Sequence, residues 1–163
     1  METLSELFEY QLQLAYSMEH RLLVLLRQTA AETHSAKLRK ALAVHCNGNL
    51  VQIKRLERVF RMIQKPPAAR TCHELEGFIR QKQEFERLRP SRDLRDWVNL
   101  DIARKIEQYE IVCYASLHNL AAKLRLRAAV KLIRDNLRDE EDFLFQLKLQ
   151  SPRLASERLV PAA

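Results

Sequence analysis

The sequence contains only two glycines and five prolines in 163 residues. Proline interrupts helices, and glycine weakens them and supplies the tight turns that many other folds require. The low content of both, together with 47% hydrophobic and 30% charged residues, favours an all-α protein. At this length we expect a single domain with enough chain to bury a core.

Several classes of protein are excluded by what is missing. No apolar run reaches the roughly 18 residues of a transmembrane helix, so no membrane association is expected. The sequence has no glycine-rich phosphate or dinucleotide loop and no nucleophile elbow of a serine hydrolase. The acidic, amphipathic N-terminus METLSELFEYQ is unlike a secretory signal.

Cysteine is also scarce. Cys46, Cys72 and Cys113 are odd in number and widely spaced, without the paired spacing of a zinc site. This pattern is typical of reduced thiols in a cytoplasmic protein.

The net charge of +7 is compatible with binding to nucleic acid or to an acidic partner. Lysine and arginine are nevertheless interleaved with aspartate and glutamate along most of the chain. Such mixed charge is typical of solvated helix surfaces, so nucleic-acid binding is not the favoured interpretation.

What the sequence does contain is a set of amphipathic helical patterns with an ionisable residue inside the apolar stripe. Between residues 103 and 124 the stripe consists of Ala103, Ile106, Glu110, Cys113, Leu117, Leu120 and Leu124. Three comparable stripes are centred on Glu19, His45 and Glu140. A buried carboxylate must be neutralised, hydrogen-bonded or bound to a cation, because an isolated buried charge is very unfavourable.

The four ionisable residues are predicted to lie at one level of a helical bundle. If two hairpins turn near Thr33 and Arg125, each of the four lies 12 to 15 residues from its turn. At about 1.5 Å per helical residue, all four are then about 20 Å from the turns. Inward glutamate and histidine side chains at mid-bundle are the usual components of carboxylate-bridged metal sites.

We predict one bundle over residues 1–150 and a flexible tail over 151–163. The predicted helices cover residues 3–31, 35–64, 72–88, 92–124 and 126–149. Thr3 with Glu6, and Thr71 with Glu74, have the spacing of N-terminal capping boxes. Asn47 and Gly48 leave two possibilities open for the second helix: a short break, or a continuous helix held by packing.

The segment between the second and fourth predicted helices, residues 65–91, is longer than an antiparallel hairpin requires. It can carry the chain along the whole bundle, so these two helices can run parallel. The first two helices are expected to form one antiparallel pair and the last two the other.

Six stretches of the sequence resemble one known family in the same order and spacing. They are METLSELF, YSMEHRLL, AVHCNGNLVQIKRLERVF, TCHELEGFI, KIEQYEIVCY and NLRDEE. The family is that of the YciE/YciF-type ferritin-like proteins. The resemblance implies a ferritin-like four-helix bundle with a short additional helix in the long crossover, in a stress-associated bacterial protein with a candidate dinuclear iron site.

The resemblance also implies a set of metal ligands. The matching positions are Glu19, His45, Glu107, Glu110 and Glu140. Oxygen and imidazole ligands suit iron, manganese or zinc, as one or two ions. The chain departs from the family pattern at Gly48, where a glutamate is usual, at Gln108, where a histidine is frequent, and at Leu144, near a usual acidic position.

Two functions therefore remain open. The first is an iron-binding protein that oxidises Fe(II) or handles peroxide. The second is a non-catalytic ferritin-like scaffold or stress-response binding module that has lost its metal. In the second case, we expect His45 to contact a carboxylate and Tyr16 or Tyr109 to satisfy the remaining polar groups.

We also expect a homodimer. The resemblance implies one, and apolar residues outside the main stripes are available to form an interface: Leu23, Val24, Trp97 and Tyr114.

Overall fold

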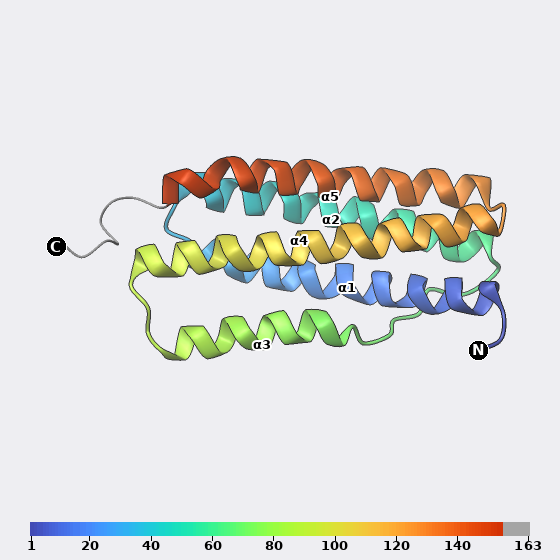
Figure 1. The fold of residues 1–163 in the computed structure, drawn as a ribbon, viewed down its shortest axis with the longest axis horizontal. Helices are drawn as coiled ribbons and strands as arrows, with labels where there is room; N and C mark the ends of the chain where they lie inside the picture. Colours follow the sequence, from blue (N-terminus) through green and yellow to red (C-terminus); the bar gives the residue numbers. More distant parts are fainter. Residues whose placement is uncertain (155–163) are drawn as a thin grey trace.

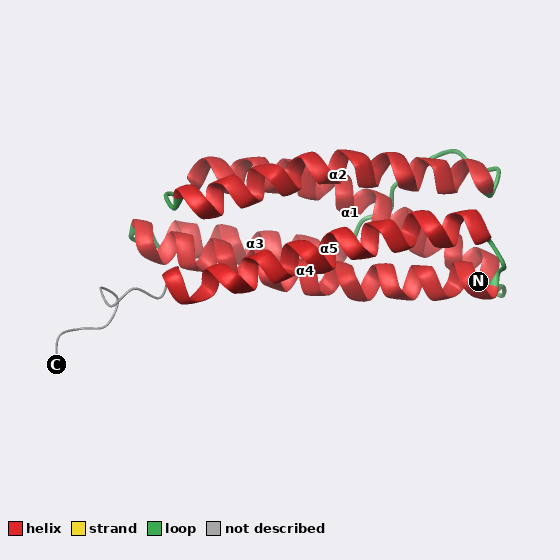
Figure 2. Cartoon of the chain, turned by 90° about the horizontal axis from the view of Figure 1, so that it is seen from above, coloured by secondary structure: helices red, strands yellow, loops and turns green. Residues whose placement is uncertain are grey.

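The computed structural model describes residues 1–154, which form five helices and no strand. The helices are α1 (Leu4–Glu32), α2 (Ala36–Met62), α3 (His73–Arg87), α4 (Arg92–Lys123) and α5 (Arg127–Leu154). Loops join the helices, and the loop between α2 and α3, residues 63–72, is extended (Figure 1 and Figure 2). The all-α prediction, including the short additional helix, is confirmed. None of the described helices is both long enough and apolar enough to cross a membrane.

Helices α1, α2, α4 and α5 form a four-helix bundle, and α3 lies outside it (Figure 1). Helices α1 and α2 run antiparallel, as do α4 and α5, while α2 and α4 run in the same direction. This arrangement is possible because the crossover and α3 return the chain along the bundle. Salt bridges from α3 to α1 fix the extra helix, with Arg21 Nε 2.6 Å from Glu76 and Lys82 Nζ 2.5 Å from Glu32.

Polar side chains define where three of the helices begin. Thr3 and Glu6 form the predicted capping box at the start of α1. Ser35 and Ser91 accept hydrogen bonds from backbone N–H groups in the first turns of α2 and α4. The buried Asp96 of α4 also accepts the backbone N–H groups of His34 and Ser35, which ties the α1–α2 turn to α4.

The capping box predicted at Thr71 and Glu74 is wrong. Helix α3 begins at His73, and its N-cap residue is Cys72, which makes no side-chain capping bond. The Cys72 thiol instead contacts the Tyr109 hydroxyl of α4 at 3.5 Å. This contact with α4 places Cys72, rather than Thr71, at the start of the helix.

Three helices are followed by a residue in the left-handed region that is not glycine; one of these residues is Arg89 after α3, with a φ angle of 52°. Gln64 after α2 and Arg125 after α4 have φ angles of 58° and 57°, in the left-handed region. The only two glycines lie inside helices instead, Gly48 in α2 and Gly77 in α3. Helix α2 is therefore continuous through Asn47 and Gly48, and packing outweighs the low helix propensity of these residues.

Helix α5 runs past its predicted end near residue 149 and finishes at Leu154. Pro152 lacks a backbone N–H and so removes one helical hydrogen bond, but the helix ends only two residues after it. The remainder of the predicted tail, 155–163, lies outside the described residues.

The bundle core consists of two apolar clusters with a buried polar layer between them. One cluster includes Leu22, Leu38 and Phe143, and the other includes Phe8, Leu56 and Ile133. The side chains of the layer come from all four bundle helices: Glu19, His45, Asn49, Gln52, Glu107, Glu110, Asn136 and Glu140.

The predicted stripe of α4 is confirmed at Leu117 and wrong at Cys113, Leu120 and Leu124, which are only half-buried. Tyr114, Leu117 and Ala121 are fully or almost fully buried, whereas Cys113 is only half-buried. Helix α4 packs against both the bundle and α3, so its apolar residues are divided between two faces. From Glu110 the inward row therefore continues four residues on rather than three.

Candidate metal centre

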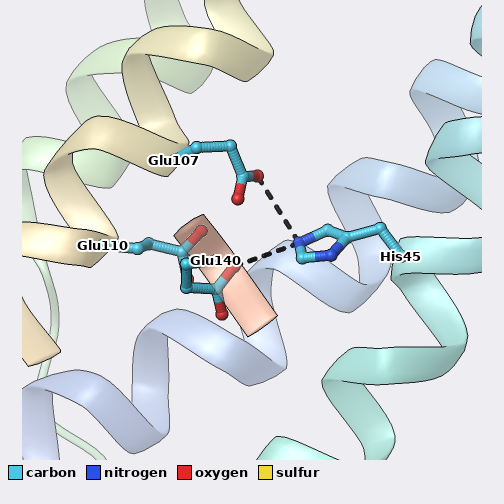
Figure 3. A group of neighbouring side chains, drawn as sticks. All are labelled: His45, Glu107, Glu110 and Glu140. Atoms are coloured by element: carbon cyan, nitrogen blue, oxygen red, sulfur yellow. Dashed lines mark ion pairs between the residues drawn. The ribbon is translucent and has the colours of Figure 1, made fainter. Parts of the chain in front are cut away.

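Four side chains from three helices converge in the polar layer. His45 comes from α2, Glu107 and Glu110 from adjacent positions on one face of α4, and Glu140 from α5 (Figure 3). One donor atom of each residue lies within 4.8 Å of those of the other three. No residue of the group is more than 7% exposed.

The imidazole of His45 lies between two carboxylates. Its Nε2 atom is 3.5 Å from Glu107 Oε1 and 3.4 Å from Glu140 Oε2, as the dashed lines in Figure 3 show. The ring stacks on Phe143 with centroids 3.8 Å apart and planes 9° from parallel. The Gln52 side-chain amide donates a hydrogen bond to Glu140 Oε1. Stacking on Phe143 therefore fixes the ring of His45, and the hydrogen bond from Gln52 fixes Glu140. His45 Nε2 and Glu140 Oε2 then face each other.

Several buried atoms of this group lack a hydrogen-bond partner within the described structure. They are His45 Nε2, Glu107 Oε2, Glu140 Oε2 and both carboxyl oxygens of Glu110. Buried polar atoms are almost always paired, because an unsatisfied one is unfavourable by about 1–3 kcal/mol. The concentration of five such atoms at one point is what a bound cation would satisfy.

The electrostatics of the group favour a cation for the same reason. Burial lowers the pKa of His45 to about 3, so its imidazole is neutral and has a free lone pair. Burial raises the pKa of Glu140 to about 7 and raises the pKa of Glu107 and Glu110 well above the ordinary carboxyl value. A cation would offset both burial and mutual repulsion, so the residues present fit a metal ion.

Glu19 lies beside this group, but its carboxylate has protein partners. Asn49 Nδ2 donates to Oε2 at 2.7 Å, and the Tyr114 hydroxyl donates to Oε1. Burial, followed by the nearby Glu140 charge, raises the pKa of Glu19. The structure thus brings together four of the five predicted ligands and holds the fifth in a neighbouring hydrogen-bond network.

The polar layer contains residues that were not predicted to act in the site. Asn136 donates to the Tyr114 hydroxyl at 3.1 Å, which extends the network to α5. Asn49 and Gln52 already lie in the predicted inward stripe of residues 35–64, so their polar character was a usable signal. Tyr114 was not predicted to lie in the layer, because the sequence pattern assigned it to the outer surface.

The two tyrosines proposed to satisfy the layer are elsewhere. Tyr16 donates to Glu57 at 3.4 Å, and the Tyr109 hydroxyl contacts Cys72. Both tyrosines are only half-buried and lie beside the row of residues that faces the bundle core.

A small cavity of about 20 Å³ lies beside the group, which is room for about one water molecule. Its lining includes Glu107 of the metal group, the buried Lys82 of α3 and Asn99 of α4. The remaining lining is mostly aliphatic, including Leu22, Ile102 and Ala103.

The sequence matches a domain of unknown function, DUF892, over residues 3–160. The chain belongs to this family. It is 31% identical over 142 residues to the protein YciF of Escherichia coli, a match that covers 86% of each chain. The resemblance predicted from the sequence motifs is therefore confirmed.

Solved structures agree with this assignment. The crystal structure of the E. coli stress protein YciF superposes with a TM-score of 0.90 at 28% identity, covering 96% of this chain and 99% of YciF. YcfI of Rhodopseudomonas palustris superposes with a TM-score of 0.87 at 24% identity, covering 90% of this chain and 94% of YcfI, which supports the fold alone. The ferritin-like bundle is thus the DUF892 fold.

Two departures from the family's motif can be placed in the structure. A Cβ atom added at Gly48 would meet no atom within 4 Å, so the position has room for a side chain. Leu144 is buried one turn after Glu140 and contributes apolar surface to the layer's edge. Both positions thus lie one turn from a residue of the metal group but carry no ligand atom.

Proposed function

We propose that the protein binds a transition-metal ion, most suitably iron, between His45, Glu107, Glu110 and Glu140. The observation that carries this proposal is the set of five unpartnered buried donor atoms that face one another. Three carboxylates and one imidazole form a mainly oxygen donor set, which suits iron or manganese and accepts zinc.

A bound iron ion would supply redox chemistry for the oxidation of Fe(II) or the handling of peroxide. The protein's own residues would set the geometry of the site. His45 would provide the nitrogen ligand, with its ring held by Phe143. Gln52 would orient Glu140 through its hydrogen bond, and Glu107 would face the small cavity beside the group.

The cellular role is inferred from relatives. YciF is a stress protein, and the identity of 31% supports a related role for this chain. Three free cysteines support a location in the reducing cytoplasm.

A metal-free scaffold is the second candidate function, and a specific observation favours it. Both carboxyl oxygens of Glu19 are satisfied by Asn49 and Tyr114, so this part of the layer is complete without an ion. Leu144 and Gly48 add no donor to it. On this view the group of His45 and three glutamates holds protons instead of a metal.

Metal analysis of the purified protein separates the two functions. We expect about one iron or manganese ion per chain in wild type after exposure to Fe(II) or Mn(II), and loss of that ion in Glu110→Gln. Glu57→Gln, which alters a carboxylate outside the layer, is the matched control and should retain the ion. Wild-type protein without metal under these conditions would reject the proposal.

A gain-of-ligand variant tests the same site from the opposite direction. Gly48→Glu places a carboxylate one turn after His45 and should raise metal content, with metal-dependent stabilisation. Gly48→Ala is the control, because it removes the helical glycine, worth up to about 1 kcal/mol, without adding a charge. A Gly48→Glu protein that is less stable than Gly48→Ala at neutral pH, and takes up no additional metal, would favour the scaffold.

A further inference from the structure

Two of the three cysteines lie beside one tyrosine outside the metal centre. Cys72 Sγ lies 3.5 Å from the Tyr109 hydroxyl, and Cys113, one turn after Tyr109 on α4, lines the same cavity as both residues. The two cysteines are 41 positions apart in sequence, by subtraction of their numbers, and lie on different segments, the crossover and α4. Neither the fold nor the metal group requires thiols to face each other at this place.

This dithiol is reachable from solvent through cavities. Cys72 and Cys113 both line a cavity of about 150 Å³, together with Met18 and Tyr109. Cys72 also lines a second cavity of about 290 Å³ on its other side, next to His20 and Arg21. A small polar oxidant can therefore reach the Cys72 sulfur although only 4% of the residue is exposed.

We propose that Cys72 and Cys113 form an oxidative modification site that hydrogen peroxide converts into an intramolecular disulfide. Cys72 is the thiol that is oxidised first, because it lines both cavities whereas Cys113 lines only one of them. Cys113, in the shared cavity, is the resolving thiol. The proposal does not depend on metal binding.

The reaction is balanced in two steps. The Cys72 thiolate attacks one peroxide oxygen, so that an S–O bond forms, the O–O bond breaks and hydroxide leaves, taking up a proton to become water. The Cys113 thiol then attacks the Cys72 sulfur, so that the S–S bond forms and the sulfenic oxygen leaves as a second water. The two sulfurs lose two electrons in total, and hydrogen peroxide gains them.

The local structure permits the approach of the two sulfurs. Cys72 follows a non-helical stretch of the crossover and has an extended backbone with φ of −90° and ψ of 102°. Its thiol donates to Glu74 Oε2 at 3.6 Å, a weak contact that the approach of Cys113 would replace. A disulfide there would join the start of α3 to α4 three residues after Glu110. Oxidation would therefore fasten the outer helix beside the metal centre.

The third cysteine provides an internal control. Cys46 is 6% exposed, and its thiol lies 3.8 Å from the Leu23 carbonyl oxygen. Its burial resembles that of Cys72, but it lines neither of the two cavities that Cys72 lines. Any general sensitivity of buried thiols to peroxide would appear at Cys46 as well.

The test is peroxide treatment of the full-length wild-type protein, alkylation of remaining thiols, and mass spectrometry of peptides prepared without reduction. We expect a Cys72–Cys113 linked peptide, with oxidation at Cys72 about tenfold faster than at Cys46. In Cys113→Ser, dimedone should trap a sulfenic acid at Cys72. In Cys46→Ser, the linked peptide should form as in wild type.

Two results would overturn the proposal. The first is oxidation of Cys46 at the same rate as Cys72. The second is the absence of an intramolecular disulfide in wild type under conditions in which dimedone labels Cys72. This includes the case in which a disulfide forms only between two chains. Because wild type itself is tested, instability of a variant does not affect these outcomes.

Discussion

Tyr114 connects two polar groups of the buried layer that have no contact with water. Its hydroxyl donates to Glu19 and accepts from Asn136, and the tyrosine is fully buried. Removing the hydroxyl leaves a carboxyl oxygen and an amide N–H without this partner. Tyr114 therefore contributes to stability through hydrogen bonds as well as through packing.

We predict that Tyr114→Phe lowers the free energy of unfolding by about 1–3 kcal/mol, because it leaves buried polar groups unpaired. Urea unfolding of the metal-free protein at neutral pH is the measurement. Tyr10→Phe removes a hydroxyl from a tyrosine that is 36% exposed, and it should change stability by less than about 0.5 kcal/mol. Equal stability of the two variants would show that the network does not hold Glu19.

The pKa values of the layer predict how stability depends on pH. The pKa of Glu140 rises from the ordinary 4.5 to about 7 in the folded protein, so the folded state retains a proton that the unfolded state has lost. Stability then falls as pH rises through this range. His45 has the opposite sign, because its pKa falls from 6.5 to about 3, but its contribution is complete above pH 6.5.

We therefore predict that the metal-free protein loses stability as pH rises from about 4.5 to about 7, with the neutralisation of His45 offsetting part of the loss below pH 6.5. Glu107 and Glu110, whose pKa values are raised well above the ordinary value, extend the loss upward. Urea unfolding in the presence of a chelator measures this slope, and Glu140→Gln should reduce it. Added metal should oppose the loss, since metal and protons compete for the same oxygens. A metal-free protein that gains stability over this range would contradict the assignment of buried, protonated carboxyl groups.

At the level of whole helices, the sequence predicted most of what the structure shows. Spacing alone placed Glu19, His45, Glu110 and Glu140 in one buried layer, because three helices present a single inward face. Helix α4 does not, since α3 covers part of its outer side. The inward row of α4 was therefore followed through Cys113 instead of Tyr114, and the partner of Glu19 was missed. Whether the layer binds a metal ion or holds protons depends on distances of a few ångströms between its side-chain atoms. The periodicity of the sequence carries no information about these distances.

The C-terminal ends of α2 and α4 could be stabilised by glycine at the residue that follows each helix, but this chain has Gln64 and Arg125 at those positions. After α4, the N–H of Leu126 bonds to the Ala121 carbonyl and that of Arg125 to the Ala122 carbonyl, both at 3.0 Å. This is a Schellman motif, in which the left-handed residue is normally glycine. Here it is the exposed Arg125, whose Cβ is unfavourable in that conformation.

We predict that Arg125→Gly raises the free energy of unfolding by about 0.5–1 kcal/mol. The matched control is Lys123→Gly, a basic and exposed residue at the last helical position of α4, which should lose about 1 kcal/mol. Thermal or urea unfolding of the two variants checks the opposite signs. A loss of stability in both would mean that Arg125 makes a contribution larger than its backbone strain.

At the scale of the whole molecule, exposed apolar side chains gather where α2 meets α5. Val44 is 61% exposed, Phe145 63% and Leu149 58%. Val44 and Leu149 line one shallow cavity of about 280 Å³ between the two helices. The surface expected from the sequence was different: Tyr114 cannot contribute because it is fully buried, and Leu23 is half-buried.

We propose that the protein forms a homodimer through this α2–α5 surface. Light scattering at micromolar concentration should give about twice the chain mass of 19.2 kDa. Phe145→Lys places a charge on α5 one turn before Leu149 and should shift the mass towards that of one chain. Leu88→Lys changes a residue that is 76% exposed beyond α3, so its mass should remain that of wild type.

The outcomes separate three possibilities. A dimer abolished by Phe145→Lys alone supports the α2–α5 surface. A dimer that both variants retain would place the interface elsewhere, and Val24 and Trp97, each about half exposed on α1 and α4, are the two residues of the surface predicted from the sequence that are available for it. A wild-type monomer would reject dimerisation. In none of these cases does the metal group change, because its four side chains all come from one chain and are buried inside a single bundle.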